Sequence, residues 1–195
     1  MDRESQGNNA DDYSARLTAK LSHEVMTRTL IRAGAFLSAY EIIKLQVVDG
    51  VKDFFWTGRE DNGRKEYYPD YETDVRARDK SLYKASVAWL VDMDALKLEQ
   101  AQILEKIHEH RHEIAHELPR ILIDPDWDIN ASLLIDAALC LRSLDVFWGR
   151  ISMDSDPRWD NTEVADKDIW GGPSLLMGSL IEIAGLLPDG IAQAG

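Results

Sequence analysis

A cluster of histidines surrounds one arginine in the second half of this 195-residue sequence. Four of the five histidines lie within the nine residues from His108 to His116, and Arg111 stands among them. A guanidinium can hold a phosphate and stabilise the charge that develops on it in a transition state. An imidazole can act as general acid or base near neutral pH. When the phosphate belongs to RNA, the 2′-hydroxyl supplies the nucleophile, so these residue types could cleave a phosphodiester without a metal.

The periodicity of the surrounding residues places Arg111 on an apolar helix face. At about 100° per residue, the same stripe takes in Leu96, Gln100, Ile103, Ile107, Ile114 and Leu118. Arg111 therefore stands where a leucine would be expected, and a buried guanidinium is costly unless a partner compensates its charge. That partner could be a carboxylate such as Asp136 or Asp145, a second subunit or an anionic ligand. His116 falls at the edge of the same stripe.

The segment Arg111-His112-Glu113-Ile114-Ala115-His116 resembles the R-x4-H motif of the HEPN superfamily, with a polar residue after the arginine and Ala-His at its end. HEPN domains are small all-α bundles that commonly dimerise, and many are metal-independent endoribonucleases that act as toxins or in abortive infection. The resemblance implies that Arg111 and His116 are the catalytic pair and that His112 assists them. It also implies a homodimer with two motifs at its interface, RNA as substrate or ligand, an antitoxin or other partner protein, and no cofactor.

One position departs from the family's pattern. HEPN toxins controlled by nucleotidyltransferase antitoxins carry a tyrosine two residues after the histidine, and Leu118 stands there in this sequence. Two further residues are candidates for contact with a bound ligand: His108, and Trp56, whose ring could stack on a base. His110 and His23 are expected to be ordinary surface residues.

A second interpretation uses the same segment as a zinc site. His112-Glu113-Ile114-Ala115-His116 is a literal H-E-x-x-H sequence, which in zinc proteases supplies two imidazole ligands and a glutamate that activates water. Glu113 would then be the base, and the third ligand would be a carboxylate such as Glu163 or Glu182. Charged residues on both sides of the motif and the lack of a later histidine count against this interpretation.

A third interpretation is a helical module that binds RNA or another protein without cutting it, with Arg111 paired to a carboxylate of a neighbouring helix. The formal net charge of −13 disfavours a surface that coats nucleic acid, because such surfaces carry a basic field over a whole face. The acidic excess is heaviest after residue 120. The charge therefore leaves room for a small, local phosphate site at the motif.

The elements that must position the motif are predicted to be helices throughout. Apolar periodicity predicts helices over residues 12–48, 75–91, 94–118 and 130–148, followed by a short one over 173–187. The first is apolar on two sides, which predicts burial between two layers or against a partner chain. Residues 49–73 lack a period and are expected to be a long inserted loop held by its aromatic side chains. The predicted fold is all-α, a HEPN-like bundle of four long helices plus a short C-terminal one.

The chain is expected to divide into a flexible tail over residues 1–10, the bundle with its inserted loop over 11–150, and an acidic connection with the C-terminal helix over 151–195, packed on the same domain. Cys140 is the one cysteine, which excludes an internal disulfide and is compatible with a reducing cytoplasm. No stretch reaches 18 consecutive apolar residues, so neither a transmembrane helix nor a membrane partner is predicted. The polar, acidic N-terminus is unlike a signal peptide, and we expect a cytoplasmic protein.

Overall fold

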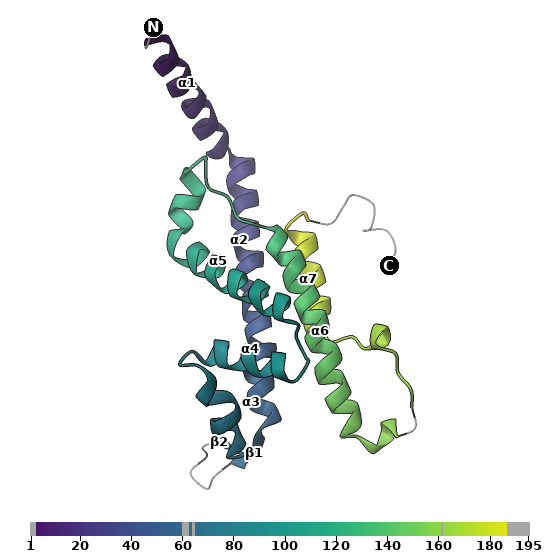
Figure 1. Ribbon diagram of the computed structural model, residues 1–195. Coiled ribbons are helices and arrows are strands. Elements are labelled where there is room, and N and C mark those ends of the chain that lie inside the picture. Colours follow the sequence, from purple (N-terminus) through teal and green to yellow (C-terminus); the bar gives the residue numbers. More distant parts are fainter. Residues whose placement is uncertain (1–2, 60–62, 64, 161, 187–195) are drawn as a thin grey trace.

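The computed structural model describes residues 3–59, 63, 65–160 and 162–186, and these are helical almost throughout (Figure 1). The α-helices are, in chain order, α1 (Arg3–Lys20), α2 (His23–Lys44), α3 (Gly50–Phe54), α4 (Leu82–Asp92), α5 (Leu98–Ile123), α6 (Ser132–Asp154) and α7 (Gly172–Ile183). Two short strands, β1 (Trp56–Arg59) and β2 (Lys65–Tyr67), pair in an antiparallel hairpin. The predicted all-α fold class is confirmed.

The helix α2 runs through the middle of the bundle, with α5 packed on one side and α6 and α7 on the other (Figure 1). Phe36, Ala39 and Ile43 of α2 are at most 1 % exposed. For α2, this burial agrees with the first of the two predicted arrangements, a helix between two layers. The predicted helix is interrupted at Ser22, whose hydroxyl accepts a hydrogen bond from the N–H of Val25 and so caps the start of α2.

The helix α1 extends away from the rest of the bundle (Figure 1). It includes residues 3–10, which the sequence predicted as a tail and which have helical backbone in the structure. Because this segment contains no proline, nothing in it stops the helix from continuing through polar residues. Polar contacts join α1 to the turn that follows α5: Arg16 pairs with Asp126, and the Lys20 ammonium donates to the carbonyl of Trp127.

The predicted long loop over residues 49–73 contains regular structure. It includes α3 and the hairpin, which lie at the end of the molecule opposite α1 (Figure 1). The strands are only four and three residues long, too short to produce a clear alternation in the sequence. The expectation that aromatic side chains hold this segment is confirmed: Phe55 and Tyr71 are buried, and the Phe55 ring centroid lies 5.5 Å from that of Trp89 on α4.

The helix α5 carries the histidine-rich motif and is kinked near its end. The sequence predicted that this helix ends at Leu118, but it bends at Glu117 (φ −113°, ψ 15°) and continues to Ile123. Pro119 accounts for the kink, because it lacks the N–H that would donate to the carbonyl of Ala115 and its ring crowds that carbonyl. The motif therefore lies in the straight part of α5, directly before the bend.

The helices α6 and α7 close the other side of the bundle. Leu141 and Leu144 of α6 and Met177 of α7 are fully buried. The connection between the two helices contains short 3₁₀ turns over Pro157–Trp159 and Asp166–Asp168, and α7 contacts both α2 and α6. Among the helices of the described ranges, none has the length and apolar character needed to span a bilayer.

Candidate functional site

Arg111 interrupts the buried face of α5. Ile107, Ile114 and Ile121 recur every seven residues along that face and are at most 1 % exposed. Arg111 lies between the first two, and its side chain is 34 % exposed. The expectation that Arg111 stands among apolar residues of the helix is confirmed. This side of α5 packs on α2, so α2 supplies the surroundings of the guanidinium.

Two neighbouring residues of α2 hold the Arg111 side chain. Its Nη2 lies 3.5 Å from Oε1 of Glu41, and its Cζ lies 5.2 Å from the centroid of the Tyr40 ring. Its Nε is buried and has no hydrogen-bond partner among the described residues. An ion pair this exposed contributes only about 0–1 kcal/mol to stability. The guanidinium has five N–H donors in all, so it retains the capacity to bind another anion.

The carboxylates that the sequence suggested as partners of Arg111 were Asp136 and Asp145. Asp145 is instead 5 % exposed and accepts a hydrogen bond from the backbone N–H of Gly171 at 3.1 Å, which fixes the start of α7 against α6. Glu41 takes the expected role because α2 packs on α5 and brings this carboxylate to Arg111.

His112 and His116 form an exposed pair one turn apart on α5. Their ring centroids are 4.3 Å apart, and both side chains are exposed. An advance of five residues from Arg111 to His116 corresponds to about 140° around a helix. Within one chain the guanidinium is therefore directed to α2, while the two imidazoles face solvent. The structure brings the two histidines together and leaves Arg111 on a different side of α5.

His108, a candidate for ligand contact, is built into the packing of α5. Its Nδ1 lies 2.7 Å from the hydroxyl of Tyr40, and its ring stacks on that of Tyr83 with 5.1 Å between centroids. Burial raises the pKa of both tyrosines, so both phenols stay protonated and the Tyr40 hydroxyl can donate to His108. His108 thus positions Tyr40, the ring on which the Arg111 guanidinium rests.

His110 is not the ordinary surface residue that the sequence suggested. Its side chain is 12 % exposed, and its ring packs edge-on against Phe36 with 5.0 Å between centroids. Its Nε2 accepts a hydrogen bond from the backbone N–H of Asn130 at 2.9 Å, and its Nδ1 lies 2.9 Å from Oε2 of Glu113. Because Nε2 accepts a hydrogen bond, the neutral His110 ring carries its proton on Nδ1. This Nδ1–H then donates to the carboxylate of Glu113. His110 therefore joins α5 to the turn before α6.

The zinc interpretation requires a third ligand near His112 and His116. Within the described part of the chain, no three His, Cys, Asp or Glu side chains are grouped so that they could hold a metal ion. Glu163 belongs to the connection between α6 and α7, and Glu182 to α7. The connection reaches only the amino-terminal end of α5, and α7 lies across α2 from the motif half of α5 (Figure 1). The expected third ligand is therefore not supplied by this chain's own fold.

Trp56, the candidate for stacking, lies in β1 and is 47 % exposed. Its indole N–H donates to the carbonyl of Gly58 within the same strand. The hairpin lies beyond α4 at one end of the molecule, whereas the motif half of α5 extends toward α1 (Figure 1). The structure does not bring Trp56 to the histidine pair.

The residues missed by sequence reasoning are Tyr40 and Glu41, which hold Arg111 from α2. No local pattern marks them, because their role follows only from the packing of α2 on α5. Comparisons of the chain with models of known families, with curated proteins and with solved structures found no match. The geometry of the motif is therefore the basis for assigning a function.

Proposed function

We propose that this chain is a metal-independent endoribonuclease of the HEPN type that acts as a homodimer. The observation that carries the proposal is the exposed imidazole pair of His112 and His116 on the same helix as Arg111, whose guanidinium is held at the edge of the core. Arg111 binds the scissile phosphate and stabilises its developing charge. His116 transfers protons and His112 assists it. Such an activity suits a cytoplasmic toxin or a phage-defence effector.

The reaction needs only groups that RNA and this chain supply. The 2′-hydroxyl attacks the adjacent phosphorus and the bond to the 5′ oxygen breaks, which leaves a 2′,3′-cyclic phosphate and a 5′-hydroxyl. One imidazole takes the proton from the 2′-hydroxyl, and another gives a proton to the departing 5′ oxygen. With ring centroids 4.3 Å apart, His112 and His116 offer two such groups within reach of one phosphate.

A second copy of the chain accounts for the different directions of Arg111 and His116. Under two-fold symmetry, Arg111 of one copy can face His116 of the other, and each dimer then holds two composite sites. An exposed apolar residue directly after α2 supports this arrangement: Leu45 is 55 % exposed. Leu45 follows Glu41 by one turn, so the two lie on the same side of the helix. Covering this face would remove apolar surface from water next to the Arg111 side chain.

The acidic residues around the motif indicate how RNA would be recognised. Glu41 is the anion that Arg111 contacts, so it competes with a phosphate for the guanidinium. Glu109, Glu113 and Glu117 are exposed on α5 around the histidines. They keep non-specific binding to the RNA backbone weak, so recognition depends on a small number of local contacts.

Cleavage of RNA in excess EDTA tests the catalytic proposal. The wild-type protein should cleave, whereas Arg111→Ala and His116→Ala should each lose roughly 10²–10⁴-fold in rate. His23→Ala is the matched control, because His23 is an exposed histidine at the start of α2, outside the motif, and its loss should leave the rate unchanged. Loss of cleavage on addition of EDTA would instead support a metal-dependent hydrolase.

Mixing the two inactive variants tests the composite site. In a dimer of one Arg111→Ala chain with one His116→Ala chain, one of the two sites regains both residues. An equal mixture that exchanges subunits freely should recover about a quarter of the wild-type activity, since half of the dimers are mixed and each has one intact site. No recovery in a mixture that has exchanged subunits would place both residues of each site in a single chain.

A non-catalytic binding module is the second candidate, favoured by the Arg111–Glu41 pair. This pair gives the arginine a carboxylate from a neighbouring helix, as that interpretation requires. A stable dimer in solution that binds RNA or a partner protein but leaves RNA intact under every condition would support the module over the nuclease.

A further inference from the structure

A cavity of about 600 Å³ lies at the amino-terminal end of α5. It is bounded by the turn before α5, the middle of α6 and the 3₁₀ turn Asp166–Asp168. Its volume falls within the roughly 300–1,000 Å³ typical of small-molecule sites. At 1.5 Å per residue, Lys97 at this end of α5 is about 28 Å along the helix from His116. The cavity is therefore separate from the histidine motif.

Positive charge gathers in the lining of this cavity. Four cationic side chains contribute to it: Lys97, Arg142, Arg150 and Lys167. Two carboxylates face them, those of Asp94 and Asp166. The chain as a whole has a formal net charge of −13, so a lining with more cations than carboxylates, drawn from three separate segments, differs in sign from the rest of the protein.

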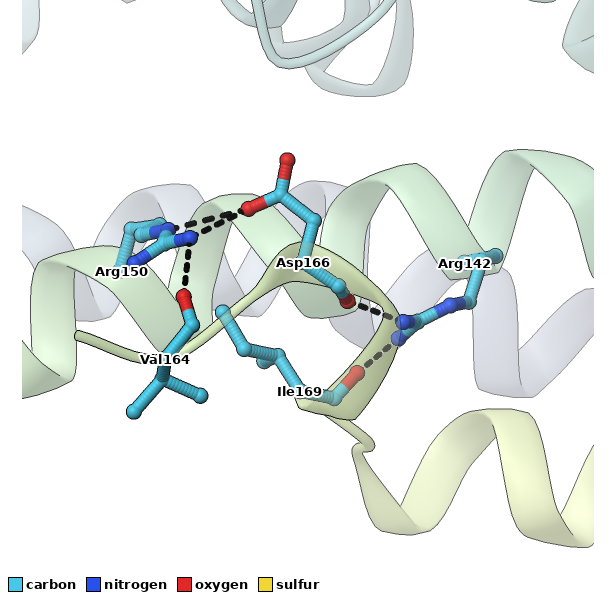
Figure 2. Close-up of polar contacts among 5 residues, drawn as sticks. All are labelled: Arg142, Arg150, Val164, Asp166 and Ile169. Atoms are coloured by element: carbon cyan, nitrogen blue, oxygen red, sulfur yellow. Dashed lines mark hydrogen bonds and ion pairs between the residues drawn. The ribbon is translucent and has the colours of Figure 1, made fainter.

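The two arginines form a fixed wall of the cavity. Figure 2 shows Arg142 and Arg150 extending from α6 to the segment Val164–Ile169. Nη2 of Arg150 donates to Oδ1 of Asp166 and to a backbone carbonyl of the segment, both at 2.6 Å. Arg142 donates to two further carbonyls of the segment, and its guanidinium lies 4.5 Å from the ring centroid of Trp170. These contacts use only part of the five N–H donors of each guanidinium, so both arginines present fixed positive charge to the cavity.

The lysines and the apolar wall complete the lining. Lys97 and Lys167 are exposed at the rim, so their long side chains can move to meet a ligand. Val146 and Phe147 of α6 provide apolar surface between the charged groups. Fixed arginines, movable lysines and an apolar patch together suit a ligand with anionic groups on a compact carbon skeleton.

We propose that this cavity binds a small organic molecule that carries two phosphate groups. A single phosphate ion would fill only a fraction of the volume. The guanidiniums of Arg142 and Arg150 lie on opposite sides of Asp166, one on its backbone carbonyl and the other on its carboxylate (Figure 2), so two separated phosphates can each approach one of them. Lys97 and Lys167 close over the phosphates, and Phe147 packs against the carbon skeleton.

Calorimetric titration of the full chain tests the ligand class. Fructose 1,6-bisphosphate is the probe, with fructose 6-phosphate, inorganic phosphate and fructose as the matched series. The bisphosphate should bind most tightly, loss of one phosphate should weaken binding about tenfold or more, and fructose should not bind. Failure of the bisphosphate to bind at millimolar concentration overturns the proposal. Equal binding of inorganic phosphate overturns the assignment of two phosphates, and tighter binding of a short RNA overturns the assignment of a small molecule.

Variants of the rim test the location of the site without disturbing the arginines that hold the connection. Lys97→Gln and Lys167→Gln should each weaken binding of the bisphosphate by about tenfold. Lys106→Gln is the matched control, since Lys106 is an exposed lysine of α5 outside the cavity. Asp166→Asn should tighten binding several-fold, because it removes a competing charge but keeps an oxygen for Arg150. Unchanged affinity in both rim variants would exclude this cavity as the site.

Discussion

Arg111 on α5 and Arg142 on α6 are both half-buried at the edge of the bundle, but their donors go to different kinds of partner. Arg142 donates to two backbone carbonyls of the connection between α6 and α7 and lies over the ring of Trp170. Arg111 contacts the exposed carboxylate of Glu41 at 3.5 Å and the face of Tyr40. Its buried Nε has no hydrogen-bond partner in the described part of the chain.

The difference shows which arginine can exchange its partner for a ligand. A backbone carbonyl is fixed by the fold, so releasing Arg142 from its segment would mean moving the connection itself. The side chain of Glu41 is about half exposed and can rotate into solvent at little cost. Arg142 is therefore held by the fold and can offer a ligand only the donors that the segment leaves free, whereas Arg111 can release Glu41 and turn those donors to another anion.

The largest expected effect on stability comes from Arg142→Ala. This change leaves two carbonyls without their donor and removes the contact with Trp170, so the free energy of unfolding should fall by about 2–3 kcal/mol. Urea unfolding followed by circular dichroism measures it. Arg111→Ala is the matched comparison and should change the same quantity by no more than about 1 kcal/mol. Equal losses in the two variants would contradict the distinction between a structural and an exchangeable arginine.

Glu41→Gln should have a smaller effect, and on binding more than on stability. Removing the carboxylate that competes for Arg111 should tighten binding of a short RNA by roughly two- to tenfold. Fluorescence anisotropy of a labelled RNA measures this in a His116→Ala background, which removes the proposed proton-transfer group. The control is Glu72→Gln, an exposed glutamate in the turn before α4. An equal gain from Glu72→Gln would show that net charge, and not the Arg111 contact, controls binding.

The sequence predicts the features of this fold that depend on residue spacing along a single helix. The periodicity of Ile107, Ile114 and their neighbours marked the buried face of α5 correctly, because burial along a helix follows directly from residue type and spacing. It also placed Arg111 on that face. The kink at Glu117 follows from Pro119, a signal that was present in the sequence but was interpreted as the end of the helix.

Features that depend on tertiary contacts could not be predicted in the same way. Glu41 becomes the partner of Arg111 only when α2 packs on α5, and His110 becomes half-buried only because Asn130 and Phe36 fold against it. The cationic cavity combines side chains from α6 with one from the turn before α5 and one from the connection after α6. None of these pairings has a fixed spacing in the chain, so no local pattern could have revealed them.

The smallest expected effect is a change in the titration of Tyr40. Burial raises the pKa of its phenol, and the positive charge of Arg111 partly opposes that rise because it favours the phenolate. Arg111→Gln should therefore raise the pKa of Tyr40 further, whereas Arg142→Ala should leave it unchanged. Phenolate absorbance during an alkaline titration measures this, with Tyr40→Phe identifying the signal.

The sign of the linked effect on stability follows from the same shift. The pKa of the Tyr40 phenol is higher in the folded protein than its unfolded value of about 10. Below that pH the phenol is neutral in both states, so it does not lower the stability of the folded protein. Stability is then lost as the pH rises from the unfolded pKa through the folded one, and Arg111→Gln should extend this loss to higher pH. An unchanged pKa of Tyr40 in Arg111→Gln would mean that the guanidinium does not rest on the ring in solution. Arg111 would then lack the support that holds it at the edge of the core, and the contrast with Arg142 would lose its basis.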